Sequence, residues 1–324
     1  MFITVSMTLA LSIGALSNNE LMVTPASSTD FLVIADMPYT PIDTDNLREG
    51  GVLGQKLKDT PHGFLMHLGD IKAGSQPCTD ELLKQNKQLL RNLTEQSFIY
   101  TPGDNEWTDC DRANLSPRYD ELERLAFIKT IMYTQEYQQQ AERLTEYKTQ
   151  VNMKENARWQ FAGVEFKTLH IAGTHNGRRQ ILMTDRLKAN EAAVQRDKLN
   201  LEWLSAANPD AKGYVIGFQA DIYTHGTEQP ACSESVVDNC DGFKVYREAI
   251  ADFAESVKKP VLVIHGDTGP YCQQSISEHL TRLNAPGDYM VSDITRVRIT
   301  PNEGQLRWQI SSLKTGKPLT RECR

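Results

Sequence analysis

Five short, largely apolar runs along this chain are each followed, within a few residues, by an aspartate. Continuous apolar runs of this length are typical of strands buried on both faces. The runs cover residues Phe31–Ala35, Gly63–Leu68, Ser97–Tyr100, Gly213–Phe218 and Pro260–Ile264. The pattern therefore predicts a buried sheet whose strands carry carboxylates at one end.

Segments with helical spacing separate several of these strands. They span residues Thr79–Leu93, Tyr119–Ile131, Tyr137–Val151, Ala189–Leu204 and Phe243–Val257. Strands that alternate with helices are usually parallel and joined by crossover helices. Ligands bind such sheets at the carboxyl ends of the strands. We therefore expect an α/β fold with its binding site among the aspartates.

Two further segments are typical of antiparallel hairpins. Residues Trp159–Ile171 alternate around a glycine turn, and Pro-Asn-Glu-Gly separates Thr295–Thr300 from Leu306–Ser312. These hairpins would extend the sheet or form a second one. Because the chain shows no internal repeat or linker, we expect residues 20–324 to form one domain.

The first nineteen residues differ from the rest of the chain. Residues Phe2–Leu16 are apolar or small and are followed by a polar Ser-Asn-Asn-Glu segment. This length suits the core of a signal peptide and is short for a membrane span. No Lys or Arg precedes the run, and a lipid-facing anchor or a buried strand are the alternatives. We predict a signal peptide over residues 1–19, with no transmembrane anchor after its removal and a periplasmic or secreted product.

The net charge indicates which partners are unlikely to bind, and the cysteines indicate the redox compartment of the protein. A net charge of −7, without any basic run, argues against a nucleic-acid-binding surface. The even number of cysteines, lying in polar loop-like stretches, favours three disulfides in an oxidising compartment over six scattered thiols in a cytosolic protein. They are Cys78, Cys110, Cys232, Cys240, Cys272 and Cys323.

The strand-end residues form a recurring polar set. Its members are Asp36, Asp70, Asp104, Gln219 with Asp221, and Asp267. Several ionised carboxylates in one cleft would repel each other strongly, and a divalent cation relieves that repulsion. Each aspartate alone could instead cap a helix or form a turn. Their order and recurrence predict a metal site.

The order of these motifs resembles that of the calcineurin-like metallophosphoesterases, over roughly residues 30–312. The chain has Asp36-Met-Pro38, Gly69-Asp70-Ile-Lys-Ala-Gly74, Gly103-Asp104-Asn105-Glu106, a later Gln219 and Gly266-Asp267-Thr-Gly269. The resemblance implies a four-layer αββα sandwich and a site for one or two divalent metal ions.

Position by position, the resemblance implies roles for individual residues. Its metal-ligand positions are occupied here by Asp36, Asp70, Asp104, Gln219 and Asp267. Asn105 stands where the family has a catalytic histidine, while Pro38 and Gly269 replace histidine ligands. Every motif histidine is therefore missing.

The remaining donors are oxygen atoms, which Mg²⁺, Mn²⁺ or Ca²⁺ prefer and Zn²⁺ does not. His265, just before the last motif, is the nearest candidate for proton transfer, and a buried structural histidine is the alternative. His175 and Asn176 could also reach the cleft.

Two functions follow from this pattern. The first is an exported, metal-dependent phosphoric-ester hydrolase that acts on a phosphorylated small molecule or another ester. The second is a non-catalytic metal- or phosphate-binding protein with the same fold. Nothing in the sequence indicates the oligomeric state.

The positions of the cysteines suggest a pairing. Cys78 and Cys110 follow the loops of Asp70 and Asp104, which adjacent strands would bring together. Cys232 and Cys240 share one loop. Cys272 would then pair with Cys323, unless Cys323 is free at a frayed terminus.

Overall fold

The protein is described by a computed structural model that covers residues 29–224, 228–302 and 305–323. The predicted signal peptide, residues 1–19, lies outside the described residues. Within the described ranges, no helix is both long and apolar enough to cross a membrane.

The first sheet has five strands in the order β12-β11-β1-β2-β3. Its parallel half consists of β1 (Asp30–Ile34), β2 (Phe64–His67) and β3 (Ser97–Tyr100). The hairpin of β11 (Thr295–Asn302) and β12 (Gln305–Ser312) adds antiparallel strands next to β1. The C-terminal strands thus complete a sheet begun by the N-terminal ones.

The second sheet has seven strands in the order β4-β5-β6-β7-β8-β10-β9. Strands β6, β7, β8 and β10 are parallel, and β4, β5 and β9 are antiparallel to their neighbours. The bounds are β4 Thr145–Gln150, β5 Met153–Phe161, β6 Val164–Thr168, β7 Gly213–Gly217, β8 Val261–His265, β9 Cys272–Ser275 and β10 Leu280–Asn284.

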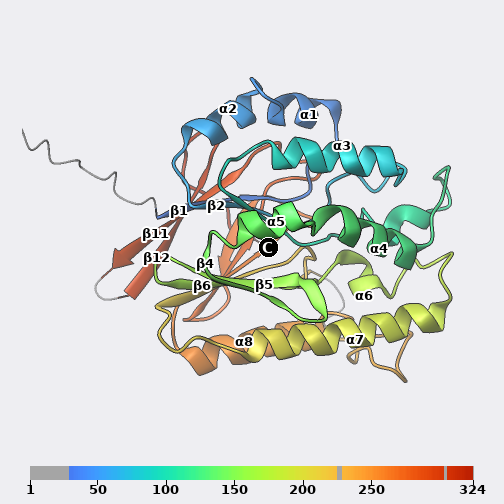
Figure 1. Ribbon diagram of the computed structural model, residues 1–324. Helices are drawn as coiled ribbons and strands as arrows, with labels where there is room; N and C mark the ends of the chain where they lie inside the picture. Colours follow the sequence, from blue (N-terminus) through green and yellow to red (C-terminus); the bar gives the residue numbers. More distant parts are fainter. Residues whose placement is uncertain (1–28, 225–227, 303–304, 324) are drawn as a thin grey trace, which may run out of the picture.

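Helices cover the outer faces of both sheets (Figure 1). On the side of the first sheet lie α1 (Pro41–Leu47), α2 (Val52–Asp59) and α3 (Asp80–Arg91). The long helix α7 (Arg186–Ser205) and helix α8 (Lys244–Val257) cover the second sheet on the opposite side. The remaining elements are α4 Glu121–Met132, α5 Gln135–Ala141, the short α6 Gly173–Gly177 and a 3-10 turn at Thr108–Asp111.

Aromatic side chains join the two sheets face to face. Phe31 and Phe64 of the first sheet make edge contacts with Phe166 of the second at centroid distances of 5.0 Å. Phe64 also meets Trp159 edge-on at 5.2 Å. A separate apolar cluster fills the space between the second sheet and its helices, where the ring of Phe253 meets that of Tyr214. The predicted four-layer αββα sandwich is confirmed.

One predicted element is wrong. The segment Tyr137–Val151, expected as a single helix, is helical only as far as Ala141 and then forms strand β4. Residues 145–150 pair with β5, and Tyr147 packs against the central core. Tertiary pairing therefore outweighs the local helical preference of this polar segment. Helices α1 and α2 and strands β9 and β10 were not predicted from the sequence.

The structure contains three disulfides, in the pairing that the cysteine positions suggested. They join Cys78 to Cys110, Cys232 to Cys240 and Cys272 to Cys323. Cys323 is therefore bonded, and the described residues contain no free cysteine. The first bond ties the loop after β2 to the loop after β3, and the last holds the C-terminal segment beside β9.

We expect loss of the Cys78–Cys110 bond to destabilise the protein more than loss of the Cys232–Cys240 bond. The two bonds span 32 and 8 residues, so the chain-entropy model assigns them about 3.7 and about 2.5 kcal/mol. Chemical denaturation of the two paired Cys→Ser variants measures the difference. Equal losses would contradict the expectation that loop length sets the order.

Candidate active site

The predicted strand-end residues meet where the two sheets come together. Asp36, Asp70 and Asp104 follow β1, β2 and β3 of the first sheet, and Gln219 and Asp267 follow β7 and β8 of the second. Gln219 is fully buried, and the aspartates are buried or nearly so. Hydrogen bonds link all five through side chains or backbone. We refer to Asp36, Asp70, Asp104 and Asp267 as the carboxylate cluster.

Three members of the carboxylate cluster have an unusual backbone conformation. Asp36, Asp70 and Asp267 have φ angles of +50°, +57° and +76°. A positive φ is uncommon for residues other than glycine, and such residues concentrate at functional sites. These turns direct the three side chains toward one another at the strand ends.

Two glycines allow the strand ends to approach so closely. A Cβ atom at Gly103 would lie 2.1 Å from Asp70 Oδ1, and one at Gly266 would lie 2.2 Å from Asp36 Oδ2. Both distances are far below van der Waals contact. Any side chain at either position would therefore displace a carboxylate of the cluster.

Asp70 lies at the centre of the hydrogen bonds. Its Oδ2 accepts from the Tyr39 hydroxyl at 2.8 Å, from Asn105 Nδ2 at 3.0 Å and from Gln219 Nε2 at 3.1 Å. The backbone N–H of Asn105 donates to Oδ1 at 3.0 Å. The buried Glu106 positions the surrounding loops, since its Oε1 accepts from the N–H groups of Asp70 and Gly103.

Gln219 faces the carboxylate cluster with its amide hydrogens. Its Oε1 accepts from the backbone N–H of Gly173 at 2.6 Å, which fixes the orientation of the amide because that N–H can only donate. The Nε2 then donates to both Asp70 and Asp104. In this arrangement the Gln219 amide nitrogen bridges two carboxylates, and its oxygen accepts from Gly173.

Arg112 and the buried Lys72 supply positive charge near the carboxylate cluster, but less than its four carboxylates would carry. Burial, followed by repulsion from neighbouring carboxylates, raises the pKa of Asp70 and Asp267 well above the usual range. Burial likewise raises the pKa of Asp36 strongly and that of Asp104 to about 6. Arg112 opposes the shift at Asp104. Such a concentration of buried acids favours binding of a cation.

In the described part of the chain, no three His, Cys, Asp or Glu side chains stand in the geometry of a metal site. Donors of the protein itself contact the carboxylate oxygens of Asp70 and Asp104. The chemistry of the donor set nevertheless fits a hard divalent ion, since it consists of carboxylate oxygens without imidazole or thiolate.

His265 lies at the end of β8, and its ring is engaged by protein groups outside the carboxylate cluster. The fully buried ring has its Nδ1 3.0 Å from the carbonyl oxygen of Gly266, and its Nε2 accepts from Arg282 Nε at 2.9 Å. Arg282 in turn pairs with Asp221 at 2.8 Å. Because both ring nitrogens are engaged inside the protein, this arrangement gives no support to the proton-transfer role expected of His265.

The other candidate residues divide between the site and the fold. Asn105 touches Asp70, as expected of its position. His175 accepts from the backbone of Gly242 and lies against Phe243, and Asn176 bonds to Asp197 and Tyr246. Through these contacts His175 packs against the segment just before α8, and Asn176 joins α7 to α8.

Tyr39 and Arg112 also lie at the site, and neither was among the candidates predicted from the sequence. Tyr39 bonds to Asp70, and it directly follows the Asp36-Met-Pro segment, a position that could have indicated it. Arg112 pairs with Asp109, and a Cβ at Gly74 would lie 2.3 Å from Arg112 Nη1 and 2.6 Å from Asn105 Oδ1. Arg112 therefore lies beside the amide of Asn105.

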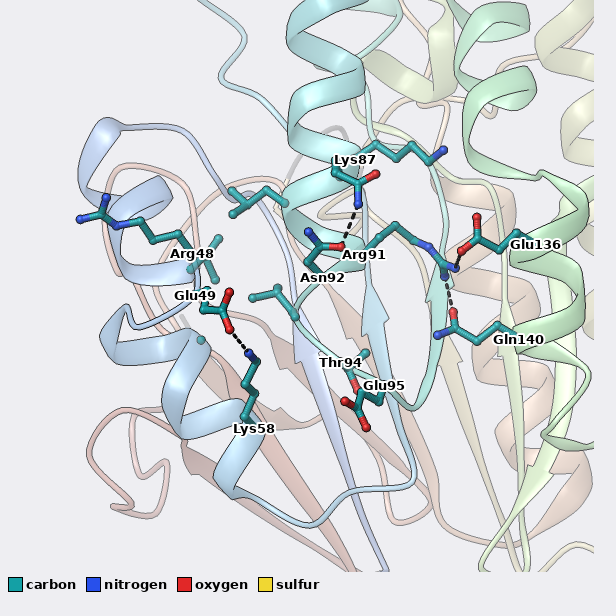
Figure 2. A pocket seen from close by; sticks show the side chains of 15 residues that line it. Arg48, Glu49, Lys58, Lys87, Arg91, Asn92, Thr94, Glu95, Glu136 and Gln140 are labelled. Atoms are coloured by element: carbon teal, nitrogen blue, oxygen red, sulfur yellow. Dashed lines mark hydrogen bonds and ion pairs between the residues drawn. The ribbon is translucent and has the colours of Figure 1, made fainter.

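A separate pocket of about 570 Å³ has Lys87, Arg91 and Glu136 in its wall (Figure 2). Thr94 and Glu95 in its wall precede β3, whereas Asp104 follows that strand, so the two sites lie at opposite ends of β3. Three of the four basic side chains in its wall have acidic partners: Arg48 with Asp45, Lys58 with Glu49, and Arg91 with Glu136. This internal pairing leaves little charge for a phosphate, so the carboxylate cluster is the better candidate site.

Comparison with known proteins identifies the fold. The chain matches no protein-family model, and no curated protein is significantly similar to it. Among solved structures, a dimetal phosphatase from Danio rerio aligns with a TM-score of 0.53 at 12% identity, covering 87% of this chain and 95% of that one. GAP50, the anchor in the inner membrane complex of Plasmodium, aligns with a TM-score of 0.46 at 12% identity, covering 90% of this chain and 89% of that one.

The likeness to the dimetal phosphatase, together with the two packed sheets, shows that this chain has a metallophosphoesterase-type fold. The resemblance seen in the motif order is thereby confirmed at the level of the fold. At 12% identity the comparison leaves the activity to be argued from the residues of the site.

A pair of carboxyl groups beside the site holds the loop before α7. Asp111 Oδ2 and Glu121 Oε1 both accept from the backbone N–H groups of Leu182 and Met183. Burial and the hydrogen bond with Glu121 raise the pKa of Asp111 to about 7. Although burial acts in the opposite direction, the bond with Asp111 helps to lower the pKa of Glu121 to about 2. The folded pair therefore retains one proton at mildly acidic pH.

We expect this pair to make stability fall as the pH rises from about 4 to about 7. In that window the folded protein holds a proton on Asp111 that the unfolded chain has released, so the free energy of unfolding decreases with pH. Asp111→Asn removes the titration and keeps a donor toward Glu121. The difference in the free energy of unfolding between the variant and the wild type, measured by urea unfolding, should therefore shift in favour of the variant from pH 5 to pH 8.

The exposed Asp45 on α1 supplies the matched control, because Asp45→Asn should shift stability equally at both pH values. An Asp111→Asn effect that is the same at pH 5 and pH 8 would contradict the shared proton.

Proposed function

We propose that this protein is an exported phosphoric-ester hydrolase that requires a hard divalent cation, with one or two ions held at the carboxylate cluster. The observation that carries the proposal is the convergence of four carboxylates from the strand ends of both sheets, without matching positive charge. The metallophosphoesterase-type fold supports the same reaction class.

Asp36, Asp70, Asp104 and Asp267 are the residues that would hold the cation. Mg²⁺, Mn²⁺ or Ca²⁺ suit such a donor set better than Zn²⁺. When bound, the ion would supply positive charge to a phosphoryl oxygen and so stabilise charge that develops in the reaction. To hold the ion, Asp70 and Asp104 would give up the hydrogen bonds that they now accept from the Gln219 amide.

Residues of the chain itself would orient the phosphoryl group. The side chain of Arg112 is 37% exposed and lies beside Asn105, so its guanidinium can meet a phosphoryl oxygen at the edge of the cluster. Asn105 donates hydrogen bonds to the Tyr39 hydroxyl and to Asp70. An amide carries no titratable proton, however, so Asn105 cannot protonate a leaving group. Esters with weakly basic leaving groups should therefore react best.

Three disulfides support the exported location, because such bonds persist in oxidising compartments. The proposed compartment is the periplasm or the extracellular medium, after removal of a leader over residues 1–19.

A non-catalytic metal- or phosphate-binding protein is the second candidate. The internal donors to Asp70 favour it, since Tyr39, Asn105 and Gln219 satisfy this carboxylate without a cation. A hydrolase and a metal-binding protein differ in turnover, and both would need an intact carboxylate cluster.

Hydrolysis of phosphomonoesters and phosphodiesters, with Mg²⁺, Mn²⁺, Ca²⁺ and Zn²⁺ supplied separately, tests the proposal. We expect turnover with one or more of the first three ions and its loss on chelation. Asp70→Asn should lower turnover at least about 100-fold and abolish cation binding in calorimetry, because a neutral amide replaces the central carboxylate. Asp45→Asn, an exposed change on α1, should alter neither.

The outcomes separate the two candidates. Cation binding that depends on Asp70, without turnover on any ester, would establish the binding protein. Unchanged cation affinity in folded Asp70→Asn protein would rule out the carboxylate cluster as the site for both.

A further inference from the structure

The segment 285–290, here named the rim loop, lies directly on the end of β1. The backbone N–H of Asp288 donates to the carbonyl oxygen of Asp36 at 3.0 Å, and that of Ala285 donates to the carbonyl oxygen of His265 at 2.7 Å. A Cβ atom at Gly287 would lie 2.2 Å from the carbonyl oxygen of Ala35. The rim loop is therefore held against the carboxylate cluster by its backbone.

Two large apolar side chains of the rim loop face solvent beside this polar site. Tyr289 is 62% exposed and Met290 is 64% exposed. Single exposed apolar side chains are common, whereas adjacent ones at the rim of a polar site form an apolar surface that a ligand can cover.

The Tyr289 ring is held in place rather than free to turn. It meets the ring of Tyr39 at a centroid distance of 5.4 Å and an interplanar angle of 61°. Its hydroxyl lies 3.1 Å from Ser75 Oγ, in the loop after β2. Tyr39 in turn bonds to Asp70. One aromatic side chain thus separates the Tyr289 ring from the central carboxylate.

We propose that Tyr289, together with Met290, forms a subsite for a flat aromatic group of the substrate whose phosphoryl group lies at the carboxylate cluster. This assignment rests on the proposed function of that cluster. An oriented ring favours stacking by another ring, and the polarisable Met sulfur adds contact with aromatic atoms. Asp288 lies next to this subsite and would repel an anionic organic group, which favours a neutral ring.

An aryl ester and a nucleotide both carry such a ring, and their shared chemistry is the stacking face. Phenyl phosphate and adenosine monophosphate are the two aromatic probes, and glycerol phosphate is the probe without a ring. Tyr289→Ala removes the face, and Tyr289→Phe keeps it while losing the hydroxyl contact with Ser75. The matched control is Leu187→Ala, which removes an exposed apolar side chain at the start of α7.

We expect Tyr289→Ala to lower kcat/KM about fivefold to tenfold for at least one aromatic probe. For glycerol phosphate, kcat/KM should change by no more than about twofold. In Tyr289→Phe, which keeps the ring, kcat/KM for the aromatic probes should stay close to that of the wild type. A loss confined to phenyl phosphate identifies an aryl ester, and a loss confined to adenosine monophosphate identifies a nucleobase. Equal losses for all three probes, or no loss for any, would overturn the subsite.

A binding measurement keeps this test separate from the proposed activity. If the wild type hydrolyses none of the probes, calorimetry with phenylphosphonate and methylphosphonate still reports on the subsite. Tighter binding of phenylphosphonate that disappears in Tyr289→Ala supports the subsite even without turnover. Equal binding of the two phosphonates by the wild type would overturn it.

Discussion

Mutual repulsion among buried carboxylates is the interaction on which the rest of this site depends. The fold places Asp36, Asp70, Asp104 and Asp267 at the strand ends where its two sheets meet, and burial removes the solvent that would screen them. Left-handed turns and close-approach glycines hold the side chains there. Such an arrangement lowers the stability of the fold unless protons, donors or a cation compensate the negative charge. The need for compensation is the reason to expect a bound cation at this site.

The protein compensates part of the charge with its own donors. The hydroxyl of Tyr39 and the amides of Asn105 and Gln219 converge on one oxygen of Asp70. These donors are neutral, so they satisfy hydrogen bonds without cancelling charge. Arg112 beside Asn105 and the buried Lys72 near Asp70 only partly offset the acids. A divalent cation would balance what remains, and this is the physical basis for proposing metal-dependent phosphoester chemistry.

Much of this architecture could be predicted from the sequence, because buried parallel strands are recognisable as short apolar runs. The strand ends at Asp36, Asp70 and Asp104 follow from those runs, and the cysteine pairs follow from the loops that adjacent strands bring together. The strand at residues 145–150 could not be predicted, since its pairing with β5 decides its conformation against a helical local pattern.

The orientation of the polar side chains could not be predicted either. The backbone N–H of Gly173, 46 residues away in the sequence, turns the amide of Gln219. Arg282 and the carbonyl oxygen of Gly266 engage the two ring nitrogens of His265. Sequence spacing places a residue at a strand end, but contacts between distant segments decide which of its atoms faces the site.

The most direct test of the account is to locate the cation in a crystal of the full chain grown or soaked with Mn²⁺. The account predicts an anomalous scattering peak with carboxylate oxygens of Asp70 and at least one other cluster aspartate about 2.0–2.6 Å away, and with the Gln219 amide turned from Asp70. A fully occupied peak elsewhere, or a cluster that keeps its present hydrogen bonds at saturating Mn²⁺, would contradict it.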